Sequence, residues 1–476
     1  MRAFFAIAHL TLRHALRSHI FQLLLLVLLL AVVFIPGTVG AGTASDFIRV
    51  TLLYSLSGVS LILALSSLWL GCYTMTHDVD SYQLHMITSK PVSRVTIWLA
   101  KWVGVNVINL LLLFLASAVI FVIIQYRFAN SEFAPAEKEK IRNEVLVGRR
   151  SYLASKPDYE AQVRERTKQM IARLQSQGVK LELTPEVLDK MQKAARLEVV
   201  SGDSELKVGK VRAWVFENLP EKIEKPVFFR YRPYIDKVAS EGQRVTRVQV
   251  LAGLPRAVNA GEQNQNIFND DKSSYNVFYN ALSAIPEQVQ SGEFHEKVLR
   301  PEWNIVSPDN KIFVAVFNGD PKGGTQFYQP ADGPKLLIEE CGFFSNYMRA
   351  VTVIAIELLI LSGLACAFGG CMSMPTAIFV VVSYLLFGSF AVFMTGLDYL
   401  SGTADHVGVF ISKLILTVVI PLQAFEATGP VAGGELIEWS RIAYLGFHYF
   451  ICRAVPIFIF GIWMYRKREL GLIIRK

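Results

Sequence analysis

The chain has 476 residues, of which 52% are hydrophobic and 18% are charged, and its mean hydropathy is +0.36. This composition is too apolar for an ordinary soluble protein of this length and is typical of a polytopic membrane protein with a polar insert. The net charge of +8 does not indicate nucleic-acid binding, because much of the excess follows an apolar run, at Arg466, Lys467 and Arg468, where membrane orientation explains it.

Six apolar runs are long enough to cross a bilayer, whose hydrocarbon core of about 30 Å requires about 20 apolar residues. They are residues 19–39, 52–74, 96–125, 347–370, 375–397 and 442–465. A seventh run, residues 407–421, is shorter and carries Lys413, so residues 405–425 are predicted to form a re-entrant or interfacial segment on the outer side. No Ala-x-Ala cleavage site follows the first run, which we therefore interpret as a retained span.

Basic residues in the short loops predict the orientation. With six spans they all fall on the side of both termini, namely Arg2, Arg13, Arg17, Lys90, Arg94 and Arg466–Arg468. We therefore predict a multi-pass protein of the bacterial cytoplasmic (inner) membrane with both termini in the cytoplasm. Residues 1–125 hold an N-terminal helix and the first three spans, residues 347–476 hold the last three, and residues 126–346 lie outside the cytoplasm.

The outer segment changes character along its length. Residues 126–204 are rich in Glu, Lys, Arg, Gln and Ala and predict helices, one of which is capped by Thr184 with Pro185 in its first turn. Residues 205–346 alternate short apolar runs with Pro, Gly, Asn and Asp turns, which predicts a β-sandwich or jelly roll. The predicted fold class is a polytopic α-helical membrane protein with an α+β extracytoplasmic domain, made of a helical hairpin and a β-sandwich.

Motifs for catalysis are absent from the sequence. It contains no Gly-x-x-x-x-Gly-Lys-Ser/Thr phosphate loop, no Gly-x-Ser-x-Gly, no His-Glu-x-x-His and no Cys-x-x-Cys. The five cysteines offer neither a disulfide framework nor the spacing of a zinc site. We therefore expect no catalytic residue, no metal site and no cofactor in this chain.

The most informative segment, residues 76–95, joins the second and third spans on the predicted cytoplasmic side. Pro91 ends any preceding helix, because the residue before a proline is disfavoured in the α region, and Ser93 can cap the third span. One interpretation is a capped turn that carries positive-inside charges. The other is that a short helix at residues 79–87 lies along the membrane face and presents a docking surface.

This segment resembles the membrane (permease) subunit of type-2 ATP-binding-cassette (ABC) transporters. An acidic residue, an amphipathic stretch, "TSKPVSR" and a span with a lysine near its start occur in that order. The resemblance implies that the segment is the coupling helix that inserts into a groove of the ATPase subunit. The residues concerned are Asp78, Asp80, Met86, Thr88, Ser89, Lys90, Pro91, Val92, Ser93, Arg94 and Lys101.

Both ends of the chain resemble the same family. "AIAHLTLRHALRSHIFQLLLL" is similar to its interfacial elbow helix, and "WMYRKRELGLIIRK" is similar to its basic–acidic tail at Arg468, Glu469 and Leu470. The resemblance covers residues 1–125 and 347–476. It implies a permease subunit of an exporter, paired with a second copy or a homologue in the lipid membrane. Two cytosolic ATPase subunits from another gene would bind ATP and Mg.

The large outer insert departs from the compact members of that family. A second interpretation is therefore that the complex moves no substrate and transmits ATP-driven motion to an extracytoplasmic envelope protein. A third is a membrane-anchored binding module without an ATPase partner. None of the three involves nucleic acid, and the sequence does not indicate the substrate.

Two ionisable residues lie near the midplane of predicted spans, about 15–16 Å from the outer boundary at about 1.5 Å per residue. They are Glu357 in the fourth span and Arg453 in the sixth. A lone charge there costs about 2.5–3.5 kcal/mol or more, so we predict a Glu357–Arg453 contact, which either locks two helices or serves the substrate path. Asn106 and Asn109 share one face of the third span and are predicted to line the interior or to form interhelical hydrogen bonds.

Overall fold

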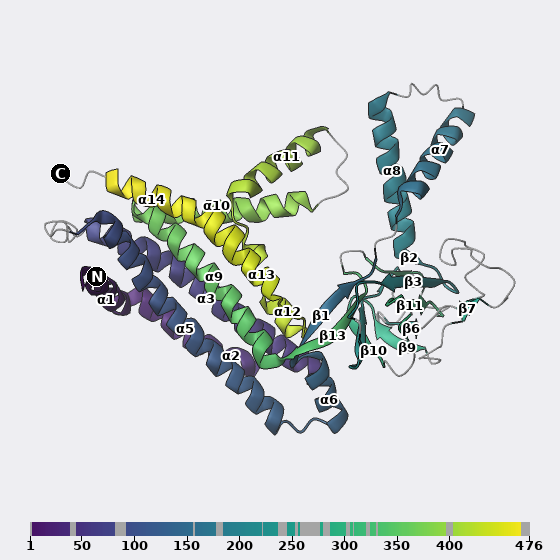
Figure 1. The fold of residues 1–476 in the computed structure, drawn as a ribbon, viewed down its shortest axis with the longest axis horizontal. Coiled ribbons are helices and arrows are strands. Elements are labelled where there is room, and N and C mark those ends of the chain that lie inside the picture. The colour runs from purple at the N-terminus through teal and green to yellow at the C-terminus, as the bar shows by residue number, and fades with distance from the viewer. Residues whose placement is uncertain are drawn as a thin grey trace. The chain divides into compact units, whose positions relative to one another are not determined.

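The structure is a computed structural model (Figure 1). It describes residues 2–38, 44–80, 92–155, 158–177, 184–220, 222–236, 245–252, 256–257, 277–278, 286–300, 305–307, 309–319, 324–329, 332–396 and 403–467. The chain divides into two compact units. The helical unit comprises Met1–Gly148 and Cys341–Lys476, and the sheet unit comprises Arg149–Glu340.

The helical unit contains long apolar helices together with several short helical segments. Its elements are α1 (Arg2–Arg17), α2 (His19–Thr38), α3 (Ala44–Asp80), α5 (Arg94–Asn130), α6 (Pro135–Glu144), α9 (Phe343–Gly369), α10 (Met374–Thr395), α11 (Thr403–Val418), the 3₁₀ turn η2 (Leu422–Phe425), α12 (Thr428–Ala432), α13 (Trp439–Tyr444), the π-helical stretch η3 (Leu445–Ala454) and α14 (Val455–Lys467).

Five helices in the described part of the chain are long and apolar enough to cross a membrane. They are α3, α5, α9, α10 and the continuous helix Trp439–Lys467. Two bent pairs raise the number to as many as seven: α1 meets α2 at 70°, and α11 meets the η2–α12 segment at 58°. The prediction of several apolar spans is therefore confirmed. The break after α11 contains Pro421, which lacks the N–H that a continuing helix needs.

Helix α9 is the central helix of this unit. It packs against α3, α5, α10 and α14, and Figure 1 shows it running alongside α5 and the last span. Close approach depends on glycine, since a Cβ added at Gly71 would lie 2.6 Å from the Ala365 Cβ, and one at Gly461 would lie 2.4 Å from the Ala367 Cβ. Such small-residue contacts let helix backbones approach closely in a membrane.

The helical unit extends further along the chain than the predicted boundary at residue 126. Helix α5 continues to Asn130, and α6 packs against α3. The reason is that Ile141 and Val145 are fully buried in the same apolar cluster as the spans.

Two four-stranded sheets form the core of the sheet unit. Their strand orders are β1-β13-β4-β10 and β3-β11-β6-β9. Alternation along the strands places aromatic residues in one shared apolar cluster, where Phe216 of β3 meets Phe229 of β4 edge-on with ring centroids 6.2 Å apart. The prediction of a separate domain containing β-sheets is confirmed.

The strands of this unit are mostly short. They are β1 (Val147–Leu153), β2 (Glu205–Leu206), β3 (Val211–Phe216), β4 (Val227–Tyr231), β5 (Tyr234–Ile235), β6 (Val245–Ala252), β7 (Arg256–Ala257), β8 (Val277–Phe278), β9 (Glu287–Gln290), β10 (His295–Leu299), β11 (Ile312–Phe317), β12 (Gln326–Phe327) and β13 (Lys335–Gly342). Strands β2, β12 and β5 form a third sheet, and β7 pairs with β8.

A helical hairpin, α7 (Glu160–Ser176) and α8 (Pro185–Ser204), precedes most of the strands (Figure 1). Helix α8 begins as predicted, with the Thr184 hydroxyl accepting the Val187 N–H and Pro185 in the first turn. At the base of the hairpin the Arg212 guanidinium binds Asp203 at 2.8 Å, which attaches the end of α8 to β3.

Candidate functional site

The structure describes only part of the predicted coupling segment. Residues 81–91, which include Met86, Thr88, Ser89, Lys90 and Pro91, lie outside the described residues, as do the side chains of Asp78 and Asp80. The residues on the C-terminal side are described, namely Val92, Ser93, Arg94 and Lys101. They show how the helix that follows the segment is held.

Ser93 caps α5, as predicted. Its backbone is extended, with φ −68° and ψ 143°, and its Oγ accepts the Thr96 N–H at 3.1 Å. This contact satisfies one of the four N–H groups that lack a partner at the start of a helix. Helix α5 therefore begins at Arg94, at the C-terminal end of the segment.

Arg94 attaches the start of α5 to the end of the last span. Its Nη1 donates to the carbonyl oxygens of Arg466, at 2.7 Å, and of Tyr465, at 3.4 Å. These carbonyls belong to the last described turn of α14, and each helix carbonyl keeps a second lone pair that can accept from a cation. The beginning of α5 and the end of α14 thus lie at the same end of the helical unit.

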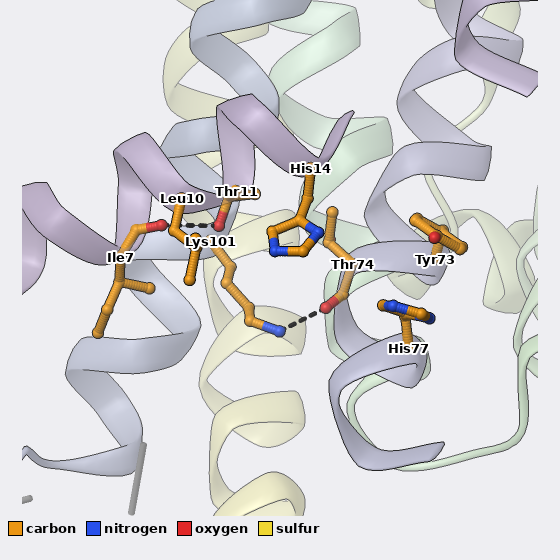
Figure 2. A pocket seen from close by; sticks show the side chains of 8 residues that line it. All are labelled: Ile7, Leu10, Thr11, His14, Tyr73, Thr74, His77 and Lys101. Atoms are coloured by element: carbon orange, nitrogen blue, oxygen red, sulfur yellow. Dashed lines mark hydrogen bonds between the residues drawn. The ribbon is translucent and has the colours of Figure 1, made fainter. Parts of the chain in front are cut away.

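Lys101 attaches α5 to α3. The side chain is only 3% exposed, and its ammonium donates to the main-chain carbonyl of Thr74. Figure 2 shows this contact beneath α1, with the rings of His14 and His77 nearby. The surrounding cavity, of about 20 Å³, has room for one water. The hydrogen bond to Thr74 offsets part of the cost of burying an ammonium.

Two tryptophans that the sequence reasoning missed complete the attachment of α5. The Trp98 indole N–H donates to the Cys366 carbonyl at 3.2 Å, and that of Trp102 donates to the Leu359 carbonyl at 3.4 Å, both on α9. Together with Arg94 they occupy positions i, i+4 and i+8, which lie on one face of a helix. That spacing is visible in the sequence and could have indicated that these three side chains share one face of the helix.

Asn106 and Asn109 form interhelical hydrogen bonds, one of the two predicted roles. Asn106 Oδ1 accepts the Ser362 hydroxyl of α9 at 2.8 Å. Asn109 Oδ1 accepts the Ser66 hydroxyl of α3 at 2.9 Å, and its Nδ2 donates to Ser67 Oγ at 3.0 Å. The two amides therefore connect α5 to different helices.

Glu357 and Arg453 have different partners in the structure, contrary to the predicted contact. Glu357 Oε2 accepts the Ser60 hydroxyl of α3 at 3.4 Å. Arg453 Nη1 donates to the Val419 carbonyl at 3.0 Å, and its guanidinium lies 5.0 Å from the centroid of the Tyr449 ring. The physical reason is that the break after α11 leaves carbonyl oxygens without helical partners, and these oxygens can stabilise a partly buried guanidinium by accepting its hydrogen bonds.

Tyr384 of α10 also binds at this break. Its hydroxyl donates to the Val418 carbonyl at 3.0 Å and accepts the Ile420 N–H at 3.0 Å. A helix can end inside an apolar region only where its backbone polar groups find such partners. Arg453 and Tyr384 therefore let α11 end beside α10, at the turn that was predicted to be re-entrant or interfacial.

The sheet unit has its own buried charged cluster. Glu296 of β10 binds Arg149 of β1 in a bidentate pair, at 2.6 and 3.1 Å, and also binds Arg230 of β4 through Nε at 2.6 Å. Burial alone would raise the pKa of Glu296, but the charges and hydrogen bonds of the two arginines outweigh it and lower that pKa to about 2. The carboxylate is therefore ionised at neutral pH.

Neither unit presents a metal site within its described residues, where no three His, Cys, Asp or Glu side chains are grouped to hold an ion. Comparisons of the chain with protein-family models, with curated proteins and with solved structures gave no significant match.

Proposed function

We propose that this chain is the permease subunit of an ABC exporter in the cytoplasmic membrane, driven by a separate cytosolic ATPase that docks on residues 76–95. Two ATPase copies and a second permease copy or a homologue would complete the complex. The helical unit would cross the membrane six times, with both termini in the cytoplasm and the sheet unit outside.

One observation carries the proposal: the helix that leaves the docking segment is joined by polar contacts to three others, and the contacts of Trp98 and Lys101 are buried. Arg94 binds the end of α14, Trp98 binds α9, and Lys101 binds α3. A push on residues 81–91 would therefore reach the last span and the central helix through hydrogen bonds rather than through loose apolar packing. The bent α1–α2 pair agrees with the elbow helix that the family resemblance implies.

The second candidate, motion transmitted to an envelope partner without transport, is favoured by the connection between β13 and α9. Strand β13 ends at Gly342 and α9 begins at Phe343, so no linker residue separates them. Covalent continuity therefore connects α9 to a strand that is paired within a sheet of four.

Affinity purification of the tagged chain from native membranes tests the proposal. We expect a vanadate-sensitive ATPase to co-purify, and the charge reversal Lys90→Glu to reduce its recovery severalfold. Lys168→Glu, on the exposed surface of α7, is the matched control and should retain the ATPase. Arg94 is unsuitable for this test because its loss would also remove its hydrogen bond to α14. Absence of an ATPase, or equal recovery in both variants, would overturn the proposal.

The same preparation separates the two candidates. Hydrogen exchange of the sheet unit is compared with and without ATP, in a complex to which no exported compound has been added. A change confined to the helical unit supports export. A change that extends into β13 and β4 supports transmission of motion to an outer partner.

A further inference from the structure

Helices α5, α9 and α14 meet in a repeated arrangement around two glycines, Gly363 within α9 and Gly370 at its C-cap. Phe458 of α14 lies against Gly363, so closely that an added Cβ would be 2.0 Å from the ring. Seven residues further along both helices, Tyr465 lies against Gly370, where an added Cβ would be 3.2 Å from the ring. Between these contacts Gly461 packs on Ala367. The heptad spacing keeps both aromatic rings on one face of α14.

The same glycines leave two carbonyl oxygens of α9 open. The side chain of a helical residue leans toward the preceding turn and covers the carbonyl four residues earlier. Gly363 and Gly370 have no side chain to cover the carbonyls of Leu359 and Cys366. Each oxygen has two lone pairs, of which the helix uses one, as where the Gly370 N–H donates to the Cys366 oxygen at 3.0 Å.

The tryptophans of α5 use the remaining lone pairs. Trp98 donates to the Cys366 oxygen and Trp102 to the Leu359 oxygen. Their rings also pack on the aromatic residue that fills the first glycine contact, since the Phe458 centroid lies 6.0 Å from that of Trp98 and 5.8 Å from that of Trp102. Each of the two glycines thus leaves room for an aromatic ring of α14. Each also leaves a carbonyl oxygen of α9 accessible to an indole N–H of α5.

We propose that α5, α9 and α14 form a rigid joint, with Trp98 and Trp102 as its positioning residues, that carries displacement of the docking segment to the central helix and the last span. This inference rests on the proposed function and deepens it by naming the helices that move together. Three side-chain N–H donors on successive turns of α5, at Arg94, Trp98 and Trp102, bind both neighbours. An aromatic contact alone would permit sliding, whereas directional hydrogen bonds fix the register.

The test measures whether the joint keeps its geometry during the ATPase cycle. Spin labels replace Leu99 of α5 and Met464 of α14, both partly exposed, in a chain in which the exposed Cys452 is changed to Ser. Their separation is measured in the purified ATPase complex, without nucleotide and after trapping with ATP and vanadate. In the wild-type chain we expect no shift on trapping.

The double variant Trp98→Phe/Trp102→Phe keeps both rings and removes both donors, and we expect its label separation to shift or broaden on trapping. The matched control is Trp69→Phe in α3, because the buried Trp69 N–H has no acceptor in the described part of the structure. The control should behave like the wild type. The single variants provide milder forms if the double variant does not assemble.

Each remaining outcome has a defined meaning. A shift in the wild-type chain, or a double variant indistinguishable from Trp69→Phe, would overturn the joint while leaving the permease proposal intact. If no ATPase co-purifies with the wild-type chain, the proposed function fails and the inference fails with it.

Discussion

The two units provide different acceptors for their cationic side chains. In the helical unit Arg94, Lys101 and Arg453 all donate to main-chain carbonyl oxygens. In the sheet unit Arg149 and Arg230 share the carboxylate of Glu296. The helical unit also has an ion pair among its described residues, the partly exposed Arg49–Asp46 contact at 4.0 Å.

The difference follows from how many main-chain carbonyl oxygens each fold leaves able to accept a further hydrogen bond. A helix carbonyl keeps a second lone pair, which Lys101 uses at Thr74 within α3, and the break after α11 leaves the Val419 carbonyl available to Arg453. A buried carboxylate partner would add a second desolvation cost, which a carbonyl largely avoids. Strands use most of their carbonyls in the sheet ladder, so a buried arginine there depends on an acidic side chain. The helical unit can therefore hold charge in an apolar setting without opposite charge.

The largest expected loss of stability comes from a substitution in the sheet unit. Glu296→Gln removes the one carboxylate shared by two buried arginines, and breaking a buried ion pair in this way costs about 3–5 kcal/mol. We expect hydrogen-exchange protection of β4 and β10 to fall accordingly in the full-length chain. Glu198→Gln, which breaks an exposed pair with Arg166, should cause no measurable loss. Equal protection in Glu296→Gln and wild type would show that the carboxylate is dispensable.

Acidification should distinguish the units with a somewhat smaller effect. The folded pKa of Glu296, about 2, lies below the unfolded value of about 4.3. The contribution of ionised Glu296 to the free energy of unfolding is complete above pH of about 4.3. It is lost as the pH falls toward 2, an effect of about 3 kcal/mol. Exchange rates corrected for their intrinsic pH dependence should reveal this loss in β4 and β10. Glu296→Gln should abolish it, and a wild-type profile that is flat in this window would contradict the assignment.

A double-mutant cycle tests the helical-unit side of the comparison. Arg453→Met leaves the Val419 carbonyl without its donor, which costs about 1–3 kcal/mol and should lower the thermal stability of the detergent-solubilised chain. Glu357→Gln should add to that effect independently, because the two side chains bind different partners. A coupling energy above about 0.5 kcal/mol would instead indicate an interaction between them.

Local sequence signals predicted local structure well. The cap at Ser93 and the Thr184-Pro185 helix start depend on residues a few positions apart, and the structure contains both. The aromatic residues of the strands, such as Trp214, lie in the core as alternation predicts. Asn106 and Asn109 form interhelical hydrogen bonds, one of their two predicted roles, but the sequence did not indicate which residues they contact.

Long-range partners were not predictable in the same way. The depth of Arg453 in its span was readable from the sequence, but its partner is a main-chain oxygen that becomes available only because α11 breaks nearby. Sequence patterns show side chains and do not show which carbonyls lack a hydrogen bond. The roles of Trp98 and Trp102 were missed for the same reason, since their acceptors depend on glycines more than 250 residues away.

The π-helical stretch η3 gives the last span an unusual constraint on length. Within this stretch, Arg453 contacts the residues that follow α11. Beyond it, Phe458 and Tyr465 pack against the glycines of α9 and its C-cap. Deleting one residue rotates everything beyond it by about 100° relative to what precedes it. Apart from Arg453, residues 445–454 should therefore tolerate many changes of side chain but neither a deletion nor an insertion. Among related sequences, this stretch would vary in amino-acid sequence while its length stays constant.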